Sequence, residues 1–176
     1  MHDRQYHQWE IVSWVDWLSI PWRDGKRENR ALWCETRNLP PTTEPMLIRR
    51  IFRATANLNL RTQKPVYHIA LTFAPTDTVE KPQAIRIIDA FLEKIGLGEH
   101  QALLVAHGDS KCLHTHIVVN RIHPITGMAW DKEHDRKRAR DALNEIETEF
   151  ALTKTPEAKA RYWRYTPEEV IAHANF

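Results

Sequence analysis

The sequence has few cysteines and no long hydrophobic run. Its 176 residues include only two cysteines, Cys34 and Cys112, too few for the disulfide framework of a small secreted protein. We expect both to be free thiols in a reducing compartment. No apolar stretch reaches the roughly 18 residues of a membrane-spanning helix, and the start Met-His-Asp-Arg lacks the apolar region of a secretory signal. We therefore expect a cytoplasmic protein with no membrane partner.

The chain also has little excess charge of either sign. A net charge of +2 does not by itself indicate a nucleic-acid partner. The length suits one well-buried domain, so we expect residues 1–176 to form a single unit. Ten histidines and seven tryptophans are the informative part of the composition, because imidazole is the commonest metal ligand and indole either fills cores or stacks on bases.

Hydrophobic periodicity and breaker residues predict the order of secondary structure. We expect residues 22–30 to form a polar, basic turn and residues 152–176 to form a helical tail. The other expected elements are helices over 8–19, 44–60, 79–95 and 133–151, and strands over 31–37, 66–73, 101–107 and 114–122. This order predicts an α+β fold with a mostly antiparallel central sheet and helices packed on one face. The other face of the sheet would stay open for a ligand.

Three histidines cluster around the last predicted hairpin. Residues two apart on a strand point to the same side, so His114 and His116 project from one face, with Asn120 further along it. An antiparallel turn would return His107 to the side of His114. Three converging imidazoles suit Zn²⁺, Mn²⁺ or a similar divalent cation, and Asp109 could orient one of them as a hydrogen-bond acceptor.

The alternative interpretation of these histidines is purely structural. A single histidine on a strand is ordinarily a hydrogen-bonded surface or core residue, and even two at alternate positions are often incidental. A zinc finger fits poorly, because Cys34 and Cys112 lack paired spacing. The combination of three histidines with an aspartate and an asparagine on one hairpin favours a metal site.

The hairpin resembles a known motif. The run His107-Gly-Asp-Ser-Lys-Cys-Leu-His-Thr-His-Ile-Val-Val-Asn-Arg121 resembles the third motif of conjugative and mobilisation relaxases, members of the HUH endonucleases. The segments at 36–39 (TRNL), 64–73 (KPVYHIALTF) and 96–107 (GLGEHQALLVAH) are similar to other parts of that family. The resemblance covers about residues 30–150.

The resemblance implies a chemistry and a partner. His107, His114 and His116 would hold a divalent metal ion (Mn²⁺, Mg²⁺ or Zn²⁺) at the scissile phosphate of single-stranded DNA, with Asp109 assisting. His68 and Thr72 would lie near that phosphate. A tyrosine would attack and form a 5′ phosphotyrosyl link, so that the DNA can later be rejoined. The partners would be an origin of transfer and accessory relaxosome proteins, in mobilisation of a plasmid or integrative element.

The sequence departs from the family at the nucleophile. Trp17 stands where the tyrosine of the first helix is expected, and indole cannot attack phosphorus. Tyr6 is the tyrosine nearest to this position, and we take it as the candidate nucleophile. Other conceivable nucleophiles are His2, His7, Tyr162 and Tyr165. Two alternatives remain open: the covalent step has been lost while DNA and metal binding persist, or a water or another residue attacks.

Basic clusters offer a surface for DNA phosphates. The candidate contacts are Thr72, Asn120 and Arg121 near the histidines, Arg49 and Arg53 on one predicted helix, and Lys26 and Arg27 in the basic turn. A third cluster, with residues such as Lys132, Arg136 and Arg140, is diluted by neighbouring acids. The tryptophans Trp14, Trp17, Trp22 and Trp130 could stack on bases or fill the core.

Two other enzyme classes fit less well. A histidine-triad nucleotide hydrolase needs a third alternating histidine, and Val118 occupies that place. A two-histidine phosphoesterase needs two His-x-Thr/Ser repeats, whereas Thr115 follows His114 one place too early. A non-catalytic module that binds an origin hairpin is the remaining alternative, and the missing tyrosine favours it.

Overall fold

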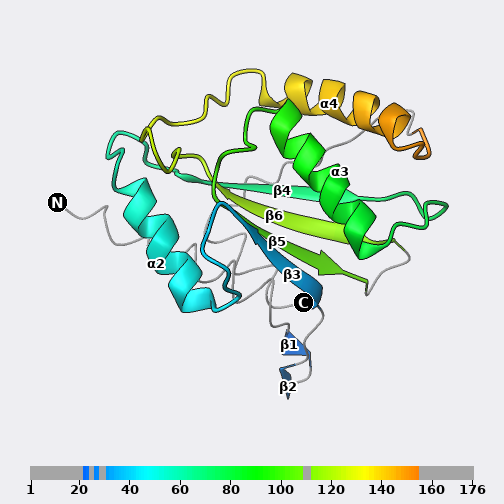
Figure 1. The fold of residues 1–176 in the computed structure, drawn as a ribbon, viewed down its shortest axis with the longest axis horizontal. Helices are drawn as coiled ribbons and strands as arrows, with labels where there is room; N and C mark the ends of the chain where they lie inside the picture. Colours follow the sequence, from blue (N-terminus) through cyan, green and yellow to red (C-terminus); the bar gives the residue numbers. More distant parts are fainter. Residues whose placement is uncertain (1–21, 24–25, 28–30, 109–111, 155–176) are drawn as a thin grey trace.

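The computed structural model describes residues 22–23, 26–27, 31–108 and 112–154. It contains a four-stranded antiparallel sheet in the order β3-β5-β6-β4 (Figure 1). A separate pair of two-residue strands forms within the predicted basic turn. The strands are β1 (Trp22–Arg23), β2 (Lys26–Arg27), β3 (Ala31–Arg37), β4 (Val66–Thr72), β5 (Ala102–His107) and β6 (His114–Asn120).

The helices are α2 (Pro45–Ala56), α3 (Lys81–Lys94) and α4 (Asp135–Glu149). The Glu44 carboxylate caps α2 by accepting hydrogen bonds from the first-turn amides of Met46 and Leu47 at 3.0 and 2.7 Å. Beyond α3, Gly96 adopts φ +80°, as a glycine after a helix end does. In the part of the chain that the structure describes, no helix is long and apolar enough to cross a membrane.

Helices α3 and α4 pack on one face of the sheet (Figure 1). Alternate strand residues supply the sheet side of this larger core, because successive side chains point to opposite faces. Its buried members include Ile69 and Leu71 of β4, Leu104 of β5, and Ile117 and Val119 of β6. The predicted α+β class and antiparallel sheet are therefore confirmed.

Helix α2 lies on the opposite face, where the sequence predicted no helix. Ile48 and Phe52 of α2 form a smaller core with Leu103, Val105 and Val118. Along β5 and β6, the strand residues of this smaller core alternate with those of the larger core. Among the described residues, no helix covers the other end of this face, where β5 ends and β6 begins (Figure 1). The face expected to stay open is thus open only in part.

Both ends of the chain lie outside the described residues, including the predicted helix over 8–19. Of the predicted tail over 152–176, only residues 152–154 are described, and they are not helical. The Thr153 amide and hydroxyl instead donate hydrogen bonds to Asp77 at 3.0 and 2.6 Å.

Asn120 joins α2 to the sheet. Its side chain is 1% exposed, and its amide nitrogen donates to the Phe52 carbonyl at 3.0 Å and to Gln101 Oε1 at 3.3 Å. Its amide oxygen accepts from the Ile122 amide at 3.0 Å. A buried polar group left without such partners is costly, so this amide fixes where α2 docks.

We predict that Asn120→Ala lowers the free energy of unfolding by about 2–3 kcal/mol, because it leaves buried donor and acceptor groups unsatisfied. Urea denaturation measures this. Asn144→Ala, at an exposed position of α4, is the control and should change stability by less than about 0.5 kcal/mol. Equal stability of the two variants would contradict the role of Asn120.

Candidate metal centre

The pairing of β5 with β6 brings the predicted ligands together. His107 lies directly opposite His114, and Val105 lies opposite His116. On the other side of β6, Thr72 pairs with His114 and Ala70 with His116. The predicted return of His107 to the side of His114 is confirmed, and it follows from antiparallel pairing across a short turn.

The three rings lie close to one another. Ring centroids are 5.3 Å apart for His107 and His114, 5.3 Å for His107 and His116, and 5.5 Å for His114 and His116. The rings of His107 and His114 are stacked, and that of His116 stands edge-on to both. His107 is buried, with 7% of its surface exposed, whereas His114 and His116 are partly exposed.

His68 of β4 is a fourth member of this cluster. Its Nε2 lies 2.9 Å from Nδ1 of His116, and the two rings are nearly parallel, with centroids 5.0 Å apart. The family resemblance implied that His68 lies near the scissile phosphate of the DNA. The structure shows it against a neighbouring imidazole, because β4 pairs with β6 along the length of both strands.

Desolvation keeps two of these imidazoles neutral. Burial, and to a smaller extent the positive charges that His68, His107 and His114 would carry, lower the pKa of His116 from 6.5 to about 3. Burial alone lowers the pKa of His68 to about 4. A neutral imidazole is the form that binds a metal ion.

The hydrogen bonds of the cluster suit ligation through Nε2. Nδ1 of His114 lies 3.4 Å from the Cys112 carbonyl oxygen, and Nδ1 of His116 faces His68. A metal-bound histidine commonly donates its other ring N–H to such an acceptor. In the described part of the chain, no three donors are already arranged around a metal position, so the rings would turn on binding. The donor set itself fits a divalent cation.

Asn120 and Arg121 are part of the protein interior. Asn120 lies on the histidine face of β6 as predicted, but beneath α2. Arg121 is 9% exposed and donates to the carbonyls of Lys64 and Trp130 at 2.9 and 2.8 Å. The prediction that both contact DNA does not fit these positions, because the Asn120 amide and both terminal guanidinium nitrogens of Arg121 bind groups of the protein itself.

Trp130 is also a core residue, and its suggested stacking on bases does not fit its position. Its ring is 8% exposed, Nε1 donates to the Ile95 carbonyl at 2.9 Å, and the Tyr67 ring lies 5.1 Å away. The other candidates are placed differently. Thr72 is exposed beside His114, and α2 carries the exposed Arg53 and the half-buried Arg49.

Several predicted site residues lie outside the described residues. They are Tyr6, Asp109, Trp14 and Trp17. Lys26 and Arg27 form β2, but the structure describes only their backbone. The proposed nucleophile and the proposed partner of an imidazole therefore remain sequence predictions.

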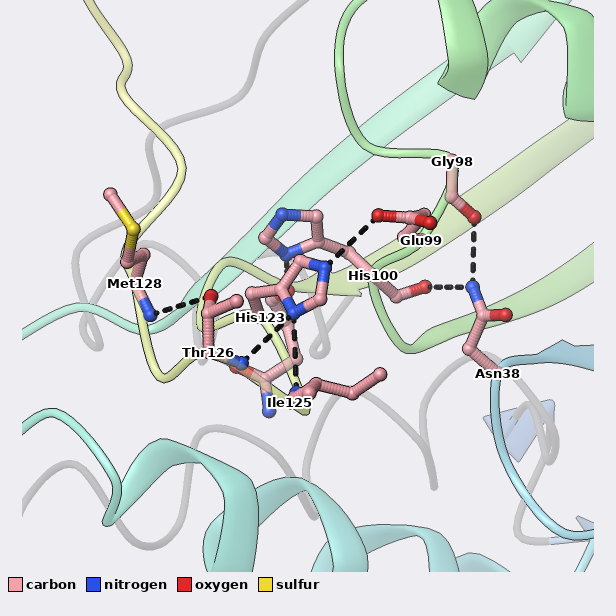
Figure 2. Close-up of polar contacts among 9 residues, drawn as sticks. Asn38, Gly98, Glu99, His100, His123, Ile125, Thr126 and Met128 are labelled. Atoms are coloured by element: carbon pink, nitrogen blue, oxygen red, sulfur yellow. Dashed lines mark hydrogen bonds and ion pairs between the residues drawn. The ribbon is translucent and has the colours of Figure 1, made fainter.

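A second histidine pair, which the sequence did not single out, has a structural role (Figure 2). His100 and His123 lie with ring centroids 5.3 Å apart. Nδ1 of His123 accepts the amides of Ile125 and Thr126 at 3.2 and 3.3 Å, and its Nε2 faces Glu99 at 3.2 Å. Both nitrogens of His123 are engaged, so this pair holds a turn. Pro124 and Gly127 are typical turn residues, so the sequence could have predicted the turn at this position.

A comparison with known protein families identifies the family of this chain. A profile for the relaxase MobA/VirD2-like nuclease domain matches residues 23–152. The chain belongs to this family. This match confirms the family predicted from the hairpin motif, and all four clustered histidines lie inside the matched range. Tyr6 and Trp17 lie before it.

Curated relatives of the relaxase domain are distant and much longer. A Protein TraI from Escherichia coli is 25% identical over 135 residues, which cover 74% of this chain and 18% of TraI. A second Escherichia coli Protein TraI is 24% identical over 102 residues, 57% of this chain and 14% of the relative. Protein MobA of Acidithiobacillus ferrooxidans is 28% identical over 67 residues, 38% of this chain and 16% of MobA. The chain spans less than a fifth of each relative.

We predict that His100 makes the stability of the relaxase domain depend on pH. Burial is the main cause that lowers its pKa below 6.5, against the opposing hydrogen bond to the Asn120 carbonyl. Below pH 6.5 the unfolded chain binds this proton more readily than the folded one, so stability falls as pH falls. In His100→Gln this contribution is absent.

Urea unfolding at about pH 7.5 and about pH 5.5 tests the prediction. The wild type should lose more unfolding free energy between the two conditions than His100→Gln. The same loss in both proteins would contradict it.

Proposed function

We propose that this relaxase domain binds single-stranded DNA at an origin of transfer, with a divalent metal ion, and nicks and rejoins it by transesterification. The process served would be mobilisation of a plasmid or integrative element, with accessory relaxosome proteins as further partners. The observation that carries the proposal is the meeting of three imidazoles, with centroids 5.3–5.5 Å apart, at the uncovered end of a sheet face in a chain of the relaxase family.

His107, His114 and His116 would hold Mn²⁺, Mg²⁺ or Zn²⁺ through their ring nitrogens. The cation, when bound, neutralises charge that develops on the phosphoryl oxygens. The low pKa of His116 keeps its lone pair available at neutral pH. Asp109 would accept a hydrogen bond from one imidazole, and the exposed Thr72 beside His114 would donate its hydroxyl to a phosphate oxygen of the DNA.

Tyr6 is the proposed nucleophile. Its phenolic oxygen would form a bond to phosphorus while the bond to the 3′ oxygen breaks. The phenolic proton would leave to solvent, and the departing 3′ oxygen would take up a proton from solvent to become a free hydroxyl. The resulting phosphotyrosyl ester conserves the energy needed for rejoining. The second candidate function is a module that binds DNA without cleaving it, and Trp17 at the expected tyrosine position favours it.

Arg49 and Arg53 of α2, with Lys26 and Arg27 of β2, are the proposed phosphate contacts. The observation that supports α2 is its position on the same sheet face as the histidines. Basic side chains near that face would attract the DNA backbone through a salt-dependent, sequence-independent interaction.

We predict that His114→Ala abolishes measurable Mn²⁺ binding, since it removes one of three ligands. Isothermal titration calorimetry with MnCl₂ measures this, and His134→Ala, at an exposed position, is the matched control. Unchanged Mn²⁺ affinity in His114→Ala would overturn the metal site.

The DNA chemistry is tested with a library of single-stranded oligonucleotides of random sequence and Mn²⁺. We expect a covalent protein–DNA adduct on a denaturing gel, and we expect Tyr6→Phe to abolish it. Cleavage without an adduct would indicate attack by water, and tight binding without cleavage would indicate the binding module. Either result would contradict Tyr6 as the nucleophile.

We predict that Arg49→Gln/Arg53→Gln weakens binding of a fluorescent single-stranded oligonucleotide several-fold and makes the dependence of affinity on salt shallower. The control is Arg86→Gln, because this exposed residue belongs to α3 on the other side of the sheet. Fluorescence anisotropy at several salt concentrations measures both quantities. An equal loss in the two variants would argue against α2 as the DNA-binding helix.

A further inference from the structure

The contact between His68 and His116 links an edge strand to the candidate metal centre. β4 pairs with β6 so that His68 lies opposite Val118 and Ala70 lies opposite His116. His68 therefore reaches His116 diagonally. The rings are nearly parallel, at 13° with centroids 5.0 Å apart, and Nε2 of His68 lies 2.9 Å from Nδ1 of His116.

The direction of this hydrogen bond decides whether His116 can bind a metal ion. A neutral imidazole carries one N–H and one lone pair. If Nδ1 of His116 donates to His68, Nε2 of His116 keeps its lone pair. If His68 donates instead, the proton of His116 sits on Nε2, and that nitrogen cannot ligate.

We propose that His68 is a positioning residue, which accepts the Nδ1–H of His116 and so presents Nε2 of His116 to the divalent cation. The inference rests on the proposed metal site and adds a role for a residue that touches neither the cation nor the DNA. It differs from the position near the phosphate that the family resemblance implied for His68.

The neighbouring ligand supports this assignment. Nδ1 of His114 faces a backbone carbonyl, that of Cys112, at 3.4 Å. A carbonyl oxygen can only accept, so in this contact Nδ1 of His114 is the donor and its Nε2 keeps the lone pair. If His116 also carries its proton on Nδ1, His68 must accept the hydrogen bond from that nitrogen, as the Cys112 carbonyl does for His114. Two adjacent ligands of β6 would then bind through the same ring atom.

Two substitutions at His68 separate a hydrogen-bonding role from a packing role. His68→Phe keeps a ring that can pack beside His116 but removes the acceptor. His68→Gln loses the ring but returns an amide oxygen near the position of Nε2. We expect His68→Phe to weaken Mn²⁺ binding about 10–100-fold, the usual effect of removing the group that orients a ligand, and His68→Gln to restore most of the affinity.

Calorimetric titration with MnCl₂ on the full chain, beside wild type and His114→Ala, measures these effects. Wild-type affinity in His68→Phe, with binding lost in His114→Ala, would overturn the positioning role and leave the metal site intact. Complete loss in both His68→Phe and His68→Gln would overturn it in favour of direct ligation. Absence of Mn²⁺ binding in wild type would instead overturn the proposed metal site.

A measurement on the unsubstituted protein keeps the inference testable if His68→Phe does not fold. Long-range ¹H–¹⁵N correlation spectra of the metal-free protein report which ring nitrogen carries the proton. We expect His116 to be protonated on Nδ1 and His68 on Nδ1 as well, with its Nε2 accepting. A proton on Nε2 of His116 would overturn the assignment.

Discussion

The register between β5 and β6 is the constraint on which the candidate site depends. Antiparallel pairing sets His107 opposite His114, and the two-residue period of a strand then puts His116 on the same face. A shift of one residue in β6 would turn His114 and His116 into the core beneath α3 and α4. It would also bring Thr115, Ile117 and Val119 to the open face. The register is therefore held by the same apolar residues that form the larger core.

The two ends of the histidine face have different roles. At one end α2 covers the sheet through Ile48 and Phe52, and the buried amide of Asn120 ties the helix backbone to the end of β6. At the other end the imidazole rings of His68, His107, His114 and His116 lie against one another. Burial there lowers the pKa of His68 and His116, so the rings stay uncharged and can pack together. The same alternation of side chains thus serves stability at one end and ligand chemistry at the other.

Local pattern predicted much of this arrangement from the sequence. The hydrophobic alternation of β4 and the polar turn before His114 were enough to predict these strands. The two-residue period of a strand alone placed the side chains of His114 and His116 on one face. What failed depends on tertiary docking. The periodicity of α2 does not show which face of the sheet the helix will cover. Because α2 docks on the face that carries the histidines, it buries Asn120. Likewise Arg121 and Trp130 carry polar and aromatic groups typical of binding sites, but the loop after β6 turns them inward to bind backbone carbonyls.

Anomalous X-ray scattering from crystals grown with Zn²⁺ or Mn²⁺ would show directly whether the histidine cluster binds a metal ion. We expect one strong peak about 2.1 Å from a ring nitrogen of each of His107, His114 and His116, with His68 outside the coordination shell and hydrogen-bonded to His116. A peak at His100 and His123, or none in the histidine cluster at saturating metal, would contradict this expectation.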